Sequence, residues 1–139
     1  MTIKARKKRS RALKFYIASS FSEKEKIRKL MDKIEKKGHK IAFDWTTHQS
    51  IKPYEKKIKL AAKYAKEDIE GVKDCDIFVM VPSKEGGSTQ FAELGVAIVM
   101  ERVKRIFVVG PYNNRSMSFF HPKVERINSI EEIFTKLFH

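Results

Sequence analysis

The sequence has 139 residues, 42% of them hydrophobic, which is enough for one domain with a single core. Its net charge is +13, and its one cysteine, Cys75, excludes an intrachain disulfide framework and a cysteine-rich zinc site. No apolar run is long enough to span a membrane, and the N-terminus lacks the apolar region of a signal peptide. We therefore expect a cytoplasmic protein without a membrane partner.

The charge is concentrated at the N-terminus. Residues 1–14 hold seven lysines and arginines and no acid, whereas the other 125 residues carry a net charge of only +6. We interpret residues 1–13 as a flexible basic arm and residues 14–139 as one folded domain. The alternative is that residues 1–14 contact RNA, DNA or another polyanion without reading its sequence.

From residue 14 the pattern alternates strands with helices. Residues 14–20 predict a strand, residues 22–37 a helix that opens with a Ser-x-x-Glu capping box, and residues 39–45 a second strand. A polar loop leads to apolar residues at helical spacing over residues 55–73. The near-continuous apolar run of residues 76–82 is typical of a strand buried on both faces of a parallel sheet.

The second half continues this alternation. Residues 86–101 predict a loop that leads into an apolar helix, residues 105–112 a fourth strand and residues 123–128 a short fifth strand. A second capping box, Ser129 with Glu132, opens the last helix. Right-handed crossovers place such a chain in an open parallel sheet with helices on both faces. We predict a flavodoxin-like α/β fold with five strands in the order 2-1-3-4-5.

In this fold class, ligands bind beyond the carboxyl ends of the strands, at the switch point between strands 1 and 3. Three segments meet there: Ala18 to Phe21, Asp44 with Trp45, and Pro82 to Glu93. The chain has no dinucleotide-binding or P-loop motif, no metal-site spacing among its histidines and no nucleophile elbow. We therefore expect neither a metal nor an organic cofactor.

The loop before the apolar helix combines groups that suit an anion. Gly86 and Gly87 let the backbone approach a ligand, Ser88 or Thr89 can cap the helix, and the free N–H groups there suit a phosphate. Glu93 follows, and we expect the helix start to hold it ionised. An ionised carboxylate at a sugar site can attack an anomeric carbon. The alternative is that Glu93 only complements the helix dipole.

Other candidates flank the same edge. Asp68 lies near a helix C-terminus, where an acid is disfavoured, and with a pKa raised by burial it could protonate a leaving base. Tyr16 points to the opposite face of its strand from Phe15 and Ile17, and its hydroxyl could form a hydrogen bond with a carboxylate at the switch point. Trp45 could stack on a base, and His121 could belong to a lid. The alternatives are a surface charge for Asp68 and core packing for the other three.

Five segments in order complete the pattern: "FYIASSF", "AFDWT", "AKEDIEGVKDCDIFVMV", "FAELGVAI" and "FFHPKVERINSIEEI". Together they resemble the nucleoside 2-deoxyribosyltransferase superfamily, which includes 2′-deoxynucleoside 5′-phosphate N-hydrolases. The resemblance covers Lys14 to about Leu137. Its most specific piece is "ELG-x-A" after the glycine-containing loop, and the spacing of 25 residues between Asp68 and Glu93 also fits.

The resemblance implies an enzyme that cleaves the N-glycosidic bond of a nucleoside or nucleoside 5′-monophosphate, by hydrolysis or by transfer to a second base. Glu93 would be the nucleophile, Asp68 the acid that assists the departing base, and Tyr16 the residue that orients the nucleophile. Ser19, Ser20 and Phe21 would line the sugar and its 5′ end. The resemblance also implies a homodimer or larger assembly in which a neighbouring chain helps to close the site.

The 5′ end of the substrate is where the chain departs from the pattern. Some transferases carry an acid that contacts the sugar's 5′-hydroxyl at the position of Gly87, which favours a 5′-phosphorylated substrate here. The phosphate-contacting serine of the nucleotide hydrolases is displaced by one residue, to Ser88. Two other functions stay open. The first is a nucleotide-binding module without turnover, or a relative of NAD-cleaving Toll/interleukin receptor-like domains. The second is a nucleic-acid-binding protein that uses the basic arm.

Overall fold

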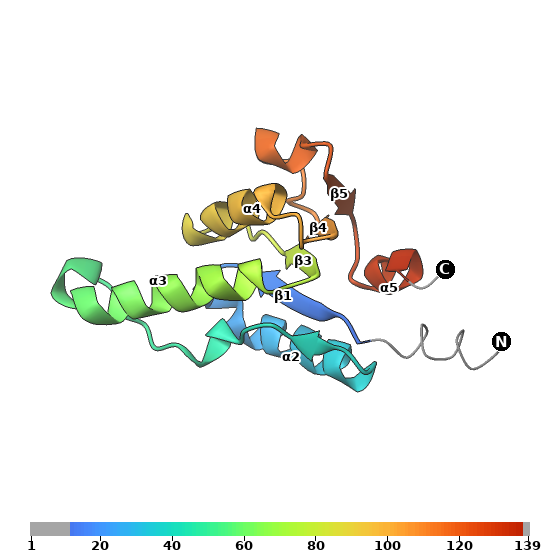
Figure 1. Cartoon of the computed structure of the whole chain (residues 1–139). Coiled ribbons are helices and arrows are strands. Elements are labelled where there is room, and N and C mark those ends of the chain that lie inside the picture. The colour runs from blue at the N-terminus through green and yellow to red at the C-terminus, as the bar shows by residue number, and fades with distance from the viewer. Residues whose placement is uncertain (1–11, 138–139) are drawn as a thin grey trace.

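The chain folds around one parallel sheet (Figure 1). A computed structural model describes residues 12–137, so nearly all of the predicted basic arm lies outside the described residues. The sheet has the order β2-β1-β3-β4-β5, which confirms the predicted flavodoxin-like fold. Its strands are β1 (Lys14–Ala18), β2 (Lys40–Ile41), β3 (Ile77–Met80), β4 (Arg105–Val109) and β5 (Val124–Ile127).

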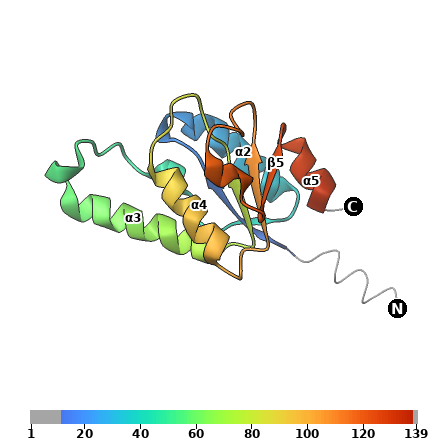
Figure 2. The same cartoon turned by 90° about the horizontal axis from the view of Figure 1, so that it is seen from above.

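Helices cover both faces of the sheet (Figures 1 and 2). Helices α3 (Ile58–Lys73) and α4 (Thr89–Val99) lie side by side on one face. Helices α2 (Lys24–Lys36) and α5 (Glu131–Leu137) cover the other, and the start of α3 extends beyond the sheet. All four residues of β3 are buried, as its continuous apolar run predicted.

The second strand is shorter than predicted, because only Lys40 and Ile41 pair with β1. The chain then leaves the sheet edge. The side chain of Asp44 accepts a hydrogen bond from the Thr46 backbone N–H and caps a 3₁₀ turn, η2 (Trp45–Thr47). Local side-chain bonding of this kind competes with strand pairing and ends β2 early.

The helix ends follow the predictions in part. Gly38 has a φ of 92° just after α2, as expected for a C′ glycine. The first predicted capping box is wrong, because the Ser22 hydroxyl bonds to the Ser20 hydroxyl and a 3₁₀ turn, η1 (Phe21–Glu23), precedes α2. The second predicted capping box forms only in part: the Glu132 carboxylate accepts a hydrogen bond from the Ser129 backbone N–H. Across residues 12–137, no helix combines the length and apolar character that crossing a membrane requires.

Candidate functional site

A hydrogen bond between Tyr16 and Glu93 forms the centre of the site. Tyr16 lies in the middle of β1 and, by strand alternation, points to the α3/α4 face, opposite to Phe15 and Ile17. Its hydroxyl donates to Glu93 Oε2 at 2.6 Å, and both side chains are buried. The ring stacks on Phe78 of the neighbouring strand, with 5.9 Å between centroids. Strand packing therefore fixes the direction of the phenol.

Helix α4 brings Glu93 to this phenol. Its buried residues are Gln90, Glu93, Leu94 and Ala97, which form the i, i+3, i+4, i+7 stripe of a helix that packs on a sheet. Two of these four are polar. A glutamate on the buried face of a core helix is rare unless it is paired or functional, so this position requires an explanation beyond packing.

A glycine brings α3 close enough for Asp68 to join them. A Cβ added to Gly71 would lie 2.6 Å from Phe43 Cβ and 3.0 Å from Tyr16 Cε2, so the helix approaches the Tyr16 ring only because Gly71 has no side chain. Asp68 lies three residues earlier, on the same side of α3. The Asp68 charge raises the pKa of both Tyr16 and Glu93, so the two carboxyls and the phenol form one electrostatically coupled cluster.

Burial sets the protonation of this cluster. It raises the pKa of Asp68 to about 7, and the nearby Glu67 charge adds to the effect. Burial also raises the pKa of Glu93 to about 8, which the Tyr16 hydrogen bond opposes and the Asp68 charge reinforces. The pKa of Tyr16 is well above its ordinary value because of burial and these two charges. At neutral pH the cluster therefore retains protons that exposed carboxyls would have lost.

The expectation that the helix start holds Glu93 ionised is wrong for the folded chain. Helix α4 begins at Thr89, so Glu93 lies in its second turn, beyond the free N–H groups of the first. Desolvation outweighs the helix dipole there, and the Tyr16 hydroxyl is the donor that favours ionised Glu93.

His48 lies on the Asp68 side of the cluster, and no metal-site or catalytic pattern in the sequence pointed to it. Its ring stacks on Tyr64 at 3.7 Å between centroids, and its Nε2 lies 3.2 Å from Glu67 Oε1. Its Nδ1 lies 3.8 Å from Asp68 Oδ1, a buried oxygen without a hydrogen-bond partner in the described part of the chain. The position of His48, in the loop after the second strand, was the one available signal.

Gln90 is the second residue that sequence reasoning missed. It is buried one turn before Glu93, and its Oε1 also has no hydrogen-bond partner within residues 12–137. Its amide donates to the Gly87 carbonyl at 3.3 Å. The signal was a polar residue in register with Glu93 on the buried stripe of an otherwise apolar helix. Gln90 thus links Glu93 to the glycine-containing loop.

The loops after β1 and β3 meet beside this cluster. The Ser19 hydroxyl donates to the Val81 carbonyl at 2.7 Å, and the Ser20 and Ser83 hydroxyls lie 3.1 Å apart. Ala18 is fully buried and Phe21 is half-buried. The predicted switch point between strands 1 and 3 is therefore a junction of serine hydroxyls.

The glycine-containing loop runs from this junction into α4. A Cβ added to Gly86 would lie 2.5 Å from Gln90 Nε2, whereas one added to Gly87 would meet no atom within 4 Å. Ser88 is exposed and precedes α4, and its hydroxyl makes no capping hydrogen bond. Gly87 and Ser88 therefore leave open space at the start of the helix that carries Glu93.

Trp45 and His121 are placed differently from the other candidates. Trp45 is buried, and its indole N–H donates to the Ile17 carbonyl at 2.5 Å, which matches the core-packing alternative. His121 is exposed, and its Nδ1 accepts the backbone N–H of Lys123. The Lys123 ammonium caps carbonyls at the C-terminal end of α4, so His121 lies towards the opposite end of that helix from Thr89.

The cluster is able to hold, donate and accept protons at two carboxyls, the buried Glu93 and the partly buried Asp68. Among the described residues, no group of three or more His, Cys, Asp and Glu side chains could hold a metal ion.

Comparisons of the chain with protein-family models, with curated proteins and with solved structures found no match.

Proposed function

We propose that the cluster of Tyr16, Asp68 and Glu93 cleaves the N-glycosidic bond of a nucleoside or nucleoside 5′-monophosphate. The observation that carries this proposal is the buried Tyr16–Glu93 hydrogen bond of 2.6 Å beside a second carboxyl whose pKa is raised to about 7. Glycosidic cleavage requires one ionised and one protonated carboxyl. With pKa values of about 8 for Glu93 and about 7 for Asp68, the two carboxyls share protons between pH 7 and pH 8, where an ionised Glu93 beside a protonated Asp68 is one of their states.

In the first step, the Glu93 carboxylate attacks C1′ of the sugar. The C1′–N bond breaks, its electron pair goes to the base, and the Asp68 proton is transferred to that base. The buried Asp68 Oδ1, without a partner among the described residues, is available to the departing nitrogen. The Tyr16 hydroxyl donates to Glu93 and favours the anion that attacks.

In the second step, water or another base attacks C1′, the Asp68 carboxylate takes up the proton that the attacking group loses, and the bond from C1′ to Glu93 breaks to release the Glu93 carboxylate. Water gives hydrolysis to free sugar and base, whereas a second base gives transfer. The open space at Gly87 and Ser88, at the start of α4, supports a 5′-phosphate on the substrate, since free N–H groups at a helix start bind anions.

The experiment that tests this function is chromatography of the wild-type protein after incubation with nucleosides, nucleoside 5′-monophosphates and NAD, with and without added free base. We expect release of a free base from at least one nucleoside or nucleoside monophosphate. Release of nicotinamide from NAD alone would assign the cluster to NAD cleavage. Binding of a nucleotide without release of any base would contradict the proposal and favour a binding module.

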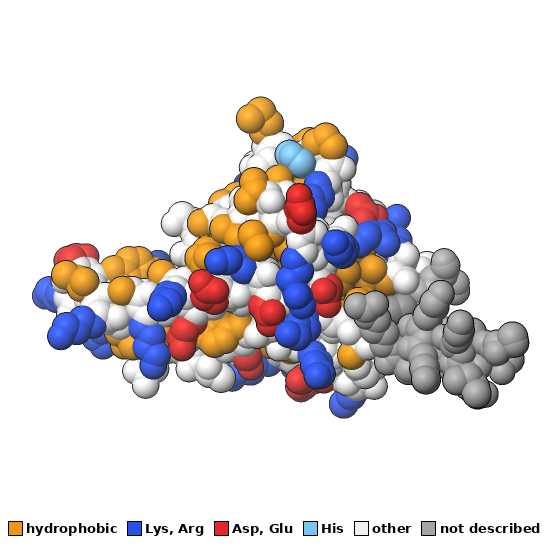
Figure 3. Space-filling view, in the orientation of Figure 1, with side chains coloured by type: hydrophobic (Ala, Val, Ile, Leu, Met, Phe, Trp, Pro, Cys, Tyr) orange, Lys and Arg blue, Asp and Glu red, His pale blue; other side chains and the backbone are white. Residues whose placement is uncertain are grey.

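We also propose that the protein forms a homo-oligomer through α4. After Thr89 at its start, the exposed residues of this helix are Phe91, Ala92, Gly95 and Val99, none of them polar, and Val99 is 76% exposed. Hydrophobic side chains gather along α3 and α4 in Figure 3, and Met117 of the adjacent 3₁₀ turn η4 (Met117–Phe120) is 91% exposed. Large exposed apolar surfaces mark interaction sites.

Light scattering tests the proposed assembly. We expect the wild type to be an oligomer and Val99→Glu to be a monomer. A monomeric wild type would contradict the proposal.

A further inference from the structure

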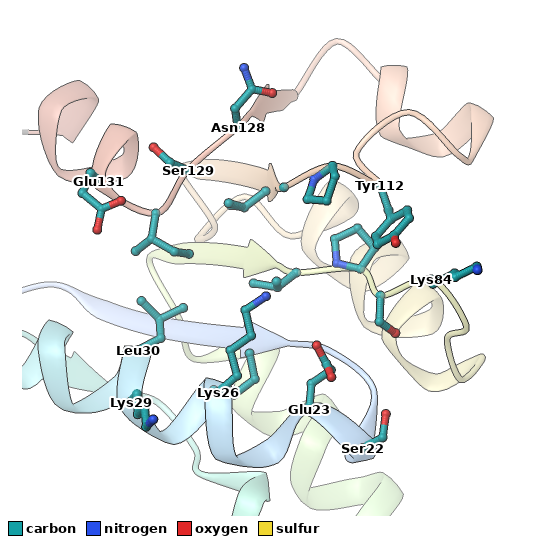
Figure 4. A pocket seen from close by; sticks show the side chains of 18 of the residues that line it. Ser22, Glu23, Lys26, Lys29, Leu30, Lys84, Tyr112, Asn128, Ser129 and Glu131 are labelled. Atoms are coloured by element: carbon teal, nitrogen blue, oxygen red, sulfur yellow. The ribbon is translucent and has the colours of Figure 1, made fainter.

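A cleft of about 700 Å³ lies on the other face of the sheet from the catalytic cluster (Figure 4). It opens between α2 and α5 at the carboxyl ends of the strands, and none of Tyr16, Asp68 and Glu93 lines it. Its volume is within the roughly 300–1,000 Å³ of small-molecule sites. The cleft is therefore large enough for a ligand of its own.

One part of the cleft wall is apolar. Leu30 of α2 and the strand-end residues Val81 and Val109 contribute aliphatic surface. Pro82, Pro111 and Tyr112 line the cleft at the ends of β3 and β4. Such rigid surfaces suit the face of a planar ring more than a flexible polar chain.

One cation reaches into this space. Figure 4 shows the Lys26 ammonium extending from α2 towards the strand ends, whereas the Lys29 side chain, which also lines the cleft, points away from them. Lys33 is neutralised by Glu131 at 2.6 Å, but Lys26 has no carboxylate within salt-bridge distance in the described chain. An unpaired ammonium above an apolar surface favours a ligand that carries its own anion.

The lining as a whole holds four lysines and three glutamates. This excess of one positive charge fits a ligand with a single anionic group and disfavours a polyanion. We propose that the cleft is a second binding site, for a small organic molecule that joins one flat ring to one phosphate or carboxylate. The anion bonds to Lys26, and the ring packs against the prolines, Tyr112 and the aliphatic wall.

Amide-resolved NMR titration of the whole protein tests this proposal. The probes are phenyl phosphate and benzoate. The controls are inorganic phosphate, which has the anion of phenyl phosphate without the ring, and phenol, which has the ring without the anion. We expect phenyl phosphate or benzoate to shift the amides of residues 26–30, 81–84 and 109–112. Each separate half binds at least about tenfold more weakly, because it lacks either the charge or the ring.

Lys26→Ala is expected to weaken binding about tenfold, whereas Lys36→Ala, an exposed lysine of the same helix that does not line the cleft, leaves it unchanged. Glu93→Gln also leaves it unchanged, since Glu93 faces the other side of the sheet. Equal binding by the wild type and Lys26→Ala overturns the proposal, as does the absence of shifts in the cleft. Equal affinity for inorganic phosphate shows that the ring has no role and overturns it too.

Discussion

Two glutamates in this molecule, Glu93 and Glu125, are held in opposite ways. Glu125 of β5 bonds to Arg105 of β4 through both carboxylate oxygens, at 2.7 and 2.8 Å, and this partner lowers its pKa. Glu93 has a phenol as its partner, lies near a second carboxyl, and has a pKa raised to about 8. The Arg105–Glu125 pair joins two strands, whereas the Tyr16–Glu93 pair concentrates unneutralised acid in the core.

The difference indicates what each pair is for. A carboxylate that serves structure is normally paired with a cation, because an unpaired buried carboxyl reduces stability. Glu93 is such a destabilising buried carboxyl, and it lies at the switch point of the sheet, where ligands bind in this fold class. Strongly perturbed acids at such positions are candidates for catalysis.

The largest expected effect is a loss of base release when Glu93 is replaced, with no such loss when Glu125 is replaced. Glu93→Gln keeps an acceptor for the Tyr16 hydroxyl but removes the nucleophile, so base release is expected to fall about 10³-fold or more. Glu125→Gln is the matched control and retains activity, because its carboxylate faces Arg105. Comparable base release by Glu93→Gln and the wild type would remove Glu93 from the chemistry.

Asp68→Asn is expected to lower base release about 10²-fold, since it removes the proton donor to the leaving base. In the wild type, activity is expected to be highest between pH 7 and pH 8, where an ionised Glu93 beside a protonated Asp68 is most populated. It falls at lower pH as Glu93 gains its proton and at higher pH as Asp68 loses its own. The alkaline fall is expected to disappear in Asp68→Asn, which rate measurements from pH 5 to pH 10 can check.

A nucleoside whose base already carries a positive charge, such as 7-methylguanosine, is the control for this role. Its base leaves without protonation, so Asp68→Asn is expected to cleave it almost as fast as the wild type. An equal loss on charged and neutral bases would assign Asp68 to folding or binding.

Tyr16→Phe is expected to lower base release about tenfold, the size of one hydrogen bond to a charged group. The Tyr16 hydroxyl lowers the pKa of Glu93, so its removal shifts the acidic side of the pH profile to higher pH. The check is the same pH series. A rate loss with an unshifted profile would mean that Tyr16 only fills space beside Phe78.

The smallest effect is on stability, and it has opposite signs at the two glutamates. The pKa of Glu93 is raised on folding, so its contribution to stability is full below its ordinary pKa near 4.5 and is lost as pH rises to about 8. At pH 8, Glu93→Gln is therefore expected to stabilise the fold by roughly 1–2 kcal/mol. Glu125→Gln is expected to destabilise it by about 0.5–1 kcal/mol, as for other half-exposed ion pairs.

Thermal unfolding at pH 5 and pH 8 measures this contrast. The wild type is expected to lose stability between the two pH values, and Glu93→Gln to lose less. If Glu93→Gln destabilises the protein at pH 8, the burial of Glu93 is not a cost to the fold.

Much of this arrangement could be predicted from sequence, for identifiable physical reasons. Alternation along β1 gave the direction of Tyr16, and the switch-point rule brought the segment of Glu93 beside it. The end of β2 was missed because Asp44 caps a turn with its side chain. The protonation of Glu93 was missed because it follows from the burial of its carboxyl, which depends on how the helices pack on the sheet. His48 was missed because a long loop returns it to α3.

The covalent intermediate provides the most direct test of the central claim. A substrate found by base release is incubated with the wild-type protein, quenched in acid within the first turnover, and analysed by intact-mass and peptide mass spectrometry. We expect a mass increase of one sugar or sugar phosphate, located on the peptide that contains Glu93 and absent from Glu93→Gln. Base release in the same sample with no adduct, or with an adduct on another residue, would contradict the assignment of Glu93 as the nucleophile.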